Sequence, residues 1–137
     1  MKQKQGFTLI ELMVSISIIA ILTALAAISF TTAQKKARDA RRSQDMKLLQ
    51  IAAEQYASQN AGAYMLSTVT PWTTAGNTVL EALPFDPKSG SAYVLNTGAT
   101  GYCFCAGMEN VSAGNALNST CTFSGGTGAY FCAKNQQ

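Results

Sequence analysis

The chain has 137 residues with a formal net charge of +3, and only 12 % of its residues are charged. This length allows one small globular domain at most. The sequence has no histidine, no carboxylates paired closely in sequence and no phosphate-binding loop, so neither enzymatic function nor a bound cofactor is expected.

A short basic stretch, MKQKQG at residues 1–6, precedes an apolar segment at residues 7–33 in which Glu11 is the one ionisable side chain. About 24 apolar residues are enough to cross a bilayer as a helix, and a carboxylate at that depth needs a partner or a function. A cleaved secretory signal is the alternative, because Ala24 and Ala26 offer a small-residue cleavage site. The length of the apolar stretch and the position of Glu11 favour a retained membrane anchor.

No proline or glycine occurs between Phe7 and Ala61, so the helix is expected to continue through residues 34–61 and to end near Asn60. Such a helix of about 54 residues would measure about 80 Å, and its lower half is expected to pack on other chains. The apolar side expected to meet the remaining domain comprises Ala37, Ala40, Leu48, Ile51 and Ala52, extended by Leu49, Ala53 and Tyr56.

The basic residues are concentrated just after the apolar segment. This stretch contains two acids, Asp39 and Asp45, and six cations: Lys35, Lys36, Arg38, Arg41, Arg42 and Lys47. A solvated helix face, or contact with acidic neighbours, is favoured over binding of nucleic acid or anionic lipid.

The remaining residues, 62–137, predict a small head built of short strands. Runs at 93–98, 102–107, 121–126 and 129–134 are rich in β-branched or aromatic residues and are bounded by Gly or Asn. Three or four antiparallel strands covering the helix would give an α+β fold. The connector from Tyr64 to Gly90 is expected to be irregular, with Trp72 in the core.

The four cysteines all lie in the last 35 residues, and their spacing matches no zinc-binding pattern. Two disulfides in an exported head are expected, and no metal site. Cys103 and Cys105 are too close along one strand to pair readily with each other. Two pairings remain open, either Cys103–Cys121 with Cys105–Cys132, or Cys103–Cys132 with Cys105–Cys121.

The string Gly6-Phe7-Thr8-Leu9-Ile10-Glu11 after a short basic leader resembles the class III signal of type IV prepilins and type II secretion pseudopilins. The resemblance implies that a prepilin peptidase cleaves between Gly6 and Phe7, that Phe7 becomes N-methylated, and that Glu11 is required for assembly. It also implies the type IV pilin fold, in which a long N-terminal helix packs with its outer half on a small antiparallel sheet.

By this resemblance the chain is expected to be a structural subunit of a type IV pilus-like filament. Residues 1–6 would be the leader, 7–33 the transmembrane and filament-core half of the helix, 34–61 its outer half, and 62–137 the disulfide-bonded head. The implied partners are identical subunits in a helical filament, the prepilin peptidase, an assembly platform with its ATPase, and the membrane before assembly. The implied location is the cell membrane, with the head outside, and then an extracellular pilus.

Two alternatives stay open. One is a type II secretion pseudopilin or a minor tip pilin with the same fold, and the other is a secreted disulfide-bonded binding domain released after Ala26. Binding of DNA or of a surface ligand is not decided by the sequence. Calcium is not expected in the C-terminal loops, because Glu109 is the only acid after Asp86.

Overall fold

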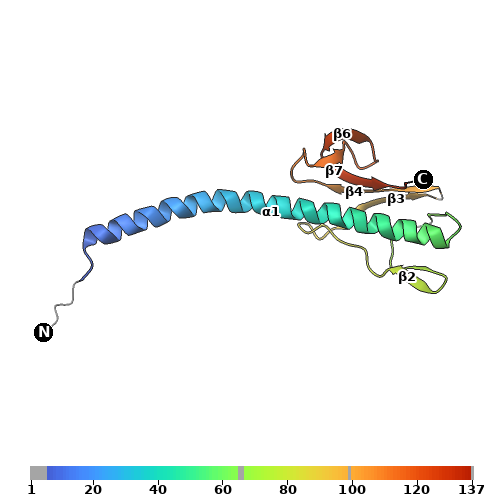
Figure 1. Cartoon of the computed structure of the whole chain (residues 1–137), viewed down its shortest axis with the longest axis horizontal. Coiled ribbons are helices and arrows are strands. Elements are labelled where there is room, and N and C mark those ends of the chain that lie inside the picture. The colour runs from blue at the N-terminus through green and yellow to red at the C-terminus, as the bar shows by residue number, and fades with distance from the viewer. Residues whose placement is uncertain (1–5, 65–66, 99, 137) are drawn as a thin grey trace. The chain divides into compact units, whose positions relative to one another are not determined.

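The computed structural model describes residues 6–64, 67–98 and 100–136. A long helix, α1 (Leu9–Gln59), is followed by short strands (Figure 1). The strands are β1 (Trp72–Thr74), β2 (Asn77–Leu80), β3 (Val94–Gly98), β4 (Gly101–Gly107), β5 (Gly114–Ala116), β6 (Phe123–Gly128) and β7 (Tyr130–Lys134). The predicted α+β class is confirmed. The chain divides into two compact units between Gln34 and Lys35, inside α1.

Helix α1 ends where the sequence predicts. Strong helix formers fill its second half, and the first glycine after it is Gly62. Ala61 and Gly62 both have positive φ, at 52° and 84°, and the Gly62 N–H bonds to the Ala57 carbonyl at 2.9 Å. This is a left-handed C-terminal cap, which satisfies a carbonyl that the helix leaves without a partner.

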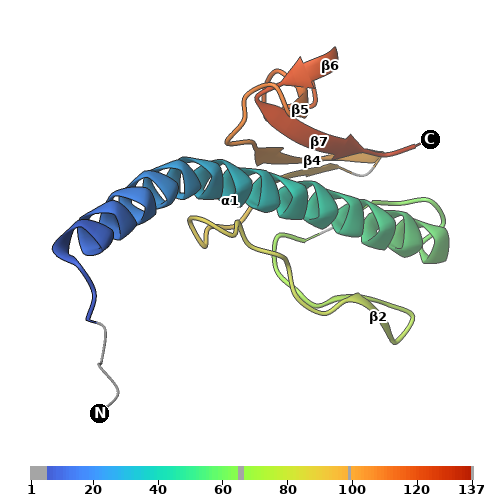
Figure 2. The same ribbon diagram turned by 60° about the vertical axis from the view of Figure 1, so that its left-hand side comes forward.

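The main sheet has five strands in the order β3-β4-β7-β5-β6, and all its pairings are antiparallel (Figure 2). The four predicted strands correspond to β3, β4, β6 and β7. Strand β5 was missed because its residues, Gly-Asn-Ala, carry no strand signal. A Cβ at Gly114 would collide with the backbone of Tyr130, and one at Gly128 with the backbone of Ala116, so glycine is required where these strands approach.

The connector before this sheet is more regular than predicted. Strands β1 and β2 pair as an antiparallel hairpin, and Ala75 and Gly76 form the turn with φ of 48° and 83°. Two consecutive positive φ values are typical of the hairpin turns that match strand twist. An irregular connector was the wrong prediction here, because Ala-Gly is a weaker turn signal than Asn-Gly.

The buried face of α1 also differs from the prediction. Leu48 and Ile51 are 47 % and 68 % exposed, and Met46, which was not predicted, is fully buried. The predicted Leu49, Ala52 and Ala53 are buried, as expected. The buried face begins with charged residues, Asp39 and Arg42, which a search for apolar periodicity does not count. The predicted face is therefore confirmed at Leu49, Ala52 and Ala53 and wrong at Ala37, Ala40, Leu48 and Ile51, which are exposed.

Trp72 is in the core, as predicted. Its side chain is 2 % exposed, its ring centroid lies 6.2 Å from that of Phe104, and its Nε1–H donates to the Ser67 carbonyl at 2.7 Å. Phe104 in turn stacks on Tyr102 with centroids 4.4 Å apart. Strand β4 thus carries the aromatic side chains that join the connector to the sheet.

Candidate processing and assembly site

The first turn of α1 is closed by a capping box. Thr8 donates to Glu11 Oε2 twice, from its backbone N–H and from its hydroxyl, each at 2.8 Å, and the Glu11 N–H donates to Thr8 Oγ1 at 3.3 Å. A carboxylate in this position also suits the positive end of the helix dipole. The sequence signal was present as Thr-x-x-Glu before an apolar run, but Thr8 had not been given a role.

Gly6, Phe7 and Thr8 precede the helix and have no regular secondary structure. Phe7 is 91 % exposed. A Cβ added at Gly6 would meet no atom of the described chain within 4 Å, and the φ of Gly6 is not in the left-handed region. The fold therefore does not itself require glycine at this position.

The segment after the capping box exposes its apolar side chains on every side. Within the described chain, α1 is the one helix long and apolar enough to cross a membrane, with a window of mean hydropathy 2.5. Its hydroxyls are bonded internally: Ser15 donates to the Glu11 carbonyl, Ser17 to that of Met13, and Thr23 to that of Ile19. Such local bonding satisfies polar groups where lipid offers no partner.

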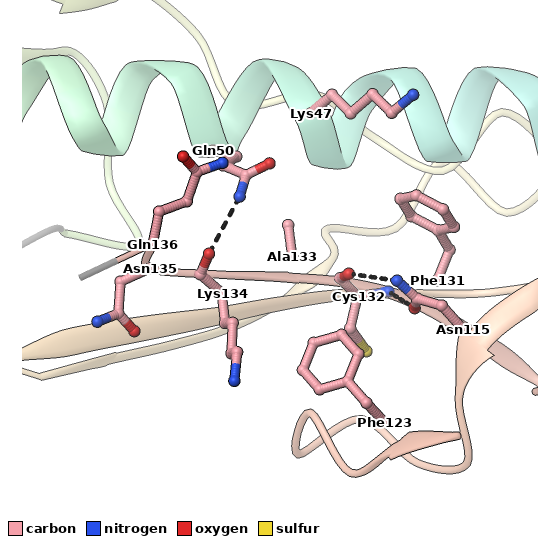
Figure 3. Close-up of a pocket in the computed structure, with 10 residues that line it drawn as sticks. All are labelled: Lys47, Gln50, Asn115, Phe123, Phe131, Cys132, Ala133, Lys134, Asn135 and Gln136. Carbon is pink, nitrogen blue, oxygen red and sulfur yellow. Dashed lines mark hydrogen bonds between the residues drawn. The ribbon is translucent and has the colours of Figure 1, made fainter. Parts of the chain in front are cut away.

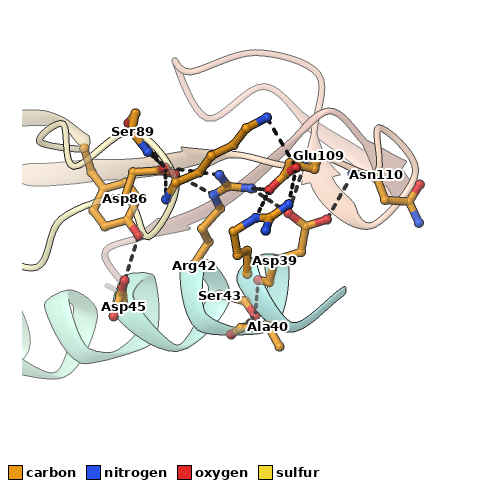
Figure 4. A network of polar contacts seen from close by, with 12 residues as sticks. Asp39, Ala40, Arg42, Ser43, Asp45, Asp86, Ser89, Glu109 and Asn110 are labelled. Carbon is orange, nitrogen blue, oxygen red and sulfur yellow. Dashed lines mark hydrogen bonds and ion pairs between the residues drawn. The ribbon is translucent and has the colours of Figure 1, made fainter. Parts of the chain in front are cut away.

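A network of ion pairs ties the outer half of α1 to two loops (Figure 4). Arg42, 4 % exposed, donates from Nε to Asp86 Oδ2 at 2.5 Å and from Nη1 to Asp39 Oδ1 at 2.8 Å. Arg38 donates to both oxygens of Glu109, at 2.5 and 2.9 Å. Asp39 also accepts from the backbone N–H groups of Glu109 and Asn110, each at 2.9 Å. Contact with acidic neighbours is therefore confirmed for two of the six clustered cations.

These contacts keep the network ionised. The Arg42 guanidinium lowers the pKa of Asp86 well below its usual range, although burial opposes the shift. The bidentate bonds from Arg38 lower the pKa of Glu109 to about 2. Hydrogen bonding to Asp86 in turn raises the pKa of Arg42. The network thus holds its charges throughout the neutral range.

A second polar cluster lies nearer the end of α1. Glu54 accepts from the hydroxyls of Tyr102 and Tyr64, at 2.7 and 2.8 Å, and from the Gln136 N–H at 3.2 Å. Burial opposes ionisation of Glu54, but these donors outweigh it and lower its pKa. Burial, reinforced by the bond to Glu54, raises the pKa of Tyr102. A carboxylate is thereby held charged at the helix–sheet boundary.

The cysteines form two disulfides, Cys103–Cys121 and Cys105–Cys132. This is one of the two pairings left open by the sequence. Cys105 and Cys132 lie directly opposite each other on β4 and β7, whereas Cys121 precedes β6. The Cys105–Cys132 bond therefore joins two adjacent strands of the sheet, and the Cys103–Cys121 bond links β4 to the loop that leads to the edge strand β6.

A hollow of about 550 Å³ lies between α1 and the end of β7 (Figure 3). Lys47 and Lys134 border it, and the Lys134 ammonium lies 5.3 Å from the centre of the Phe123 ring. The side-chain amide of Asn115 bonds to the backbone of β7 there, donating to the Cys132 carbonyl and accepting from the Cys132 N–H. The described lining contains no carboxylate and no nucleophile beside a base, so it assembles no catalytic group.

A long N-terminal helix with a capped glutamate at its start and an apolar first half, followed by a disulfide-bonded antiparallel sheet, is an α+β layout consistent with the pilin fold. Residues 1–27 match the family model for the prokaryotic N-terminal methylation motif, which is the class III signal of type IV pilins and pseudopilins. This motif supports a type IV pilin-like or pseudopilin protein. Neither the curated proteins nor the solved structures include a match to the chain.

Proposed function

We propose that the chain is the structural subunit of a type IV pilus-like filament, made as a membrane-anchored precursor and polymerised through its N-terminal helix. The observation that carries this proposal is the combination of the methylation motif with an exposed apolar segment, residues 7–33, that contains a single carboxylate. An apolar surface of this extent needs lipid or other helices around it, and identical subunits can supply the helices once the precursor leaves the membrane.

Processing would begin with a prepilin peptidase that cleaves between Gly6 and Phe7. This segment is accessible and lies outside α1, so cleavage would leave the Thr8–Glu11 capping box intact. Because the fold has room for a side chain at position 6, a requirement for glycine there would come from the peptidase. The new amine of Phe7 would then be methylated.

Assembly would use the second carboxylate oxygen of Glu11, Oε1. Both bonds from Thr8 go to Oε2, and no hydrogen bond from the described residues reaches Oε1. A carboxylate accepts several hydrogen bonds, so Oε1 can receive the Phe7 amine of a neighbouring subunit without opening the cap. Each buried charge then compensates the other, and a shift of one subunit would leave both unpaired.

A pseudopilin role or a minor tip role remains the second candidate within the same class. Calcium held in an acidic C-terminal loop, which resemblance associates with major pseudopilins, finds little support here. Glu109, the only acid after Asp86, is already bonded to Arg38, Arg42 and Lys88. The share of filament mass contributed by this chain separates a major pilin from the other two roles.

The test is the N-terminal sequence and intact mass of the mature protein from membranes and from sheared filaments. A start at Phe7 with about 14 Da of added mass for one methyl group supports the proposal. Gly6→Ala should leave a folded, uncleaved precursor, whereas Glu11→Gln should be cleaved and methylated but absent from filaments. A start at Ala27, as ordinary signal peptidase would produce, refutes the proposal.

A further inference from the structure

The ion-pair network divides the six clustered cations into groups with different surroundings. Arg38 and Arg42 are bonded to carboxylates. The other four, Lys35, Lys36, Arg41 and Lys47, are exposed and take part in no ion pair with the described residues, and Lys47 lies about 18 Å beyond Lys35 along α1. We propose that Lys35, Lys36 and Arg41 bind the headgroups of anionic phospholipids while the precursor is in the membrane. This proposal rests on the membrane-anchored precursor of the proposed function.

The position of these residues along the helix suits a headgroup layer. A hydrocarbon core of about 30 Å takes about 20 helical residues, and the apolar segment that ends at Ala33 exceeds that length. Lys35 and Lys36 are the first cations after it, and Arg41 follows about 9 Å further along α1. Helical side chains lean toward the N-terminus, so all three lean toward the apolar segment, and their long stems allow the charged ends to reach phosphate oxygens.

A second copy of the chain cannot neutralise these cations well. Of the seven acids in the sequence, Glu81 alone is exposed without an ion pair or hydrogen bond among the described residues. The others are bonded: Glu11 to Thr8, Asp39 and Asp86 to Arg42, Glu109 to Arg38, Asp45 to Tyr93, and Glu54 to two tyrosines. The complementary anions must therefore come from outside the chain.

Lipid fits this surface better than nucleic acid. Single-stranded nucleic acid is usually held by aromatic side chains that stack on its bases as well as by cations. No aromatic residue lies between Phe30 and Tyr56, and Phe30 belongs to the apolar segment. Phosphatidylglycerol requires only cations at the correct depth, and each exposed cation near an anionic surface is expected to add up to about fivefold in association.

The experiment measures which lipids surround the uncleaved full chain. Phe30→Trp places a reporter in the apolar segment, and the one natural tryptophan, Trp72, is buried in the other unit and gives a constant background. The protein is reconstituted into phosphatidylcholine vesicles that contain brominated phosphatidylglycerol or brominated phosphatidylcholine. Quenching of the new tryptophan gives the association constant of one lipid relative to the other.

We expect phosphatidylglycerol to be preferred at least fivefold at low salt and the preference to fall toward one in 0.5 M NaCl. Lys35→Gln/Lys36→Gln should remove most of it, and adding Arg41→Gln should remove the remainder. The matched control is Lys47→Gln/Lys134→Gln, which removes two other exposed cations that form no ion pair with the described residues and should keep the preference.

Several results would overturn the proposal. A ratio near one in the starting protein would do so, as would an equal loss of preference in the two double variants. Salt-sensitive binding of a single-stranded oligonucleotide, lost in the triple variant while the lipid ratio stays near one, would assign the cations to nucleic acid. Failure of every brominated lipid to quench would contradict the membrane anchor and the proposed function with it. If quenching occurs without lipid preference, the proposed function is unaffected.

Discussion

Replacing Arg42 by Gln tests whether the ion-pair network holds the head to the helix. The substitution removes the four bonds that Arg42 makes to Asp86, Asp39 and Glu109. It leaves Asp39 buried and Asp86 largely buried without their main cation. Arg41→Gln is the matched control, because Arg41 is exposed and makes no ion pair with the described residues.

The expected magnitude follows from burial. Breaking a buried pair by removing one partner costs about 3–5 kcal/mol, since an uncompensated charge stays behind. A small domain has about 5–15 kcal/mol of stability in total. Arg42→Gln should thus remove at least about a fifth of it, whereas Arg41→Gln should change it by less than about 0.5 kcal/mol.

Trp72 provides the assay, because it is the one tryptophan and is 2 % exposed. Its fluorescence would be followed during guanidinium unfolding of the oxidised full chain in detergent micelles. With a slope of about 3 kcal/mol/M, the Arg42→Gln midpoint should fall by about 1 M or more. A midpoint within about 0.3 M of the wild type, or an equal fall for Arg41→Gln, would refute the argument that buried charge pairing dominates this boundary.

Three further outcomes are expected. The pKa values of Asp86 and Glu109 are lower in the folded state than in the unfolded chain, so the folded state binds fewer protons. The free energy of unfolding, measured by the Trp72 assay, should therefore be constant above about pH 5 and fall as the pH decreases toward 2. A flat profile would contradict this. Thr8→Ala should weaken the first turn by about 1 kcal/mol, seen as roughly fivefold faster amide exchange there, and unchanged exchange would show that the cap is not formed. Replacing both Cys105 and Cys132 by Ala should cost about 3–4 kcal/mol for a sequence separation of 27 residues, and a cost below 1 kcal/mol would contradict the unfolded-chain argument.

The sequence was informative wherever one local rule determined the result. The long stretch without glycine or proline placed the end of α1 within about two residues, and Gly-bounded aromatic runs located β4 and β7. The sequence was least informative where the burial of a side chain depends on a contact with residues distant in the sequence. Arg42 is buried only because Asp86 and Glu109 come to it from 44 and 67 residues away, and nothing near Arg42 indicates those partners.

The same distinction applies to the candidate site. Gly6, Phe7 and Glu11 could be singled out from a motif of six consecutive residues, because the proposed peptidase would recognise a local sequence. The capping role of Thr8 is also local and could have been found from the Thr-x-x-Glu spacing. The disulfide pairing could not be found from the sequence, because it depends on which strands become neighbours. Strand β7 lies beside β4 and brings Cys132 opposite Cys105.

The arrangement of polar contacts along the outer half of α1 has a mechanical consequence. The head is bonded to the helix at Arg42 by ion pairs and at Glu54 by two tyrosine hydroxyls, and these positions are about 18 Å apart along the axis. Between them the fully buried Met46 and Leu49 supply apolar contact, which resists separation but has no preferred direction. Hydrogen bonds with fixed geometry at both ends oppose sliding and rotation of the head on its helix. In the proposed filament, a subunit that carries axial load through its helix would need that resistance, because a head fixed at one end alone could pivot about that end.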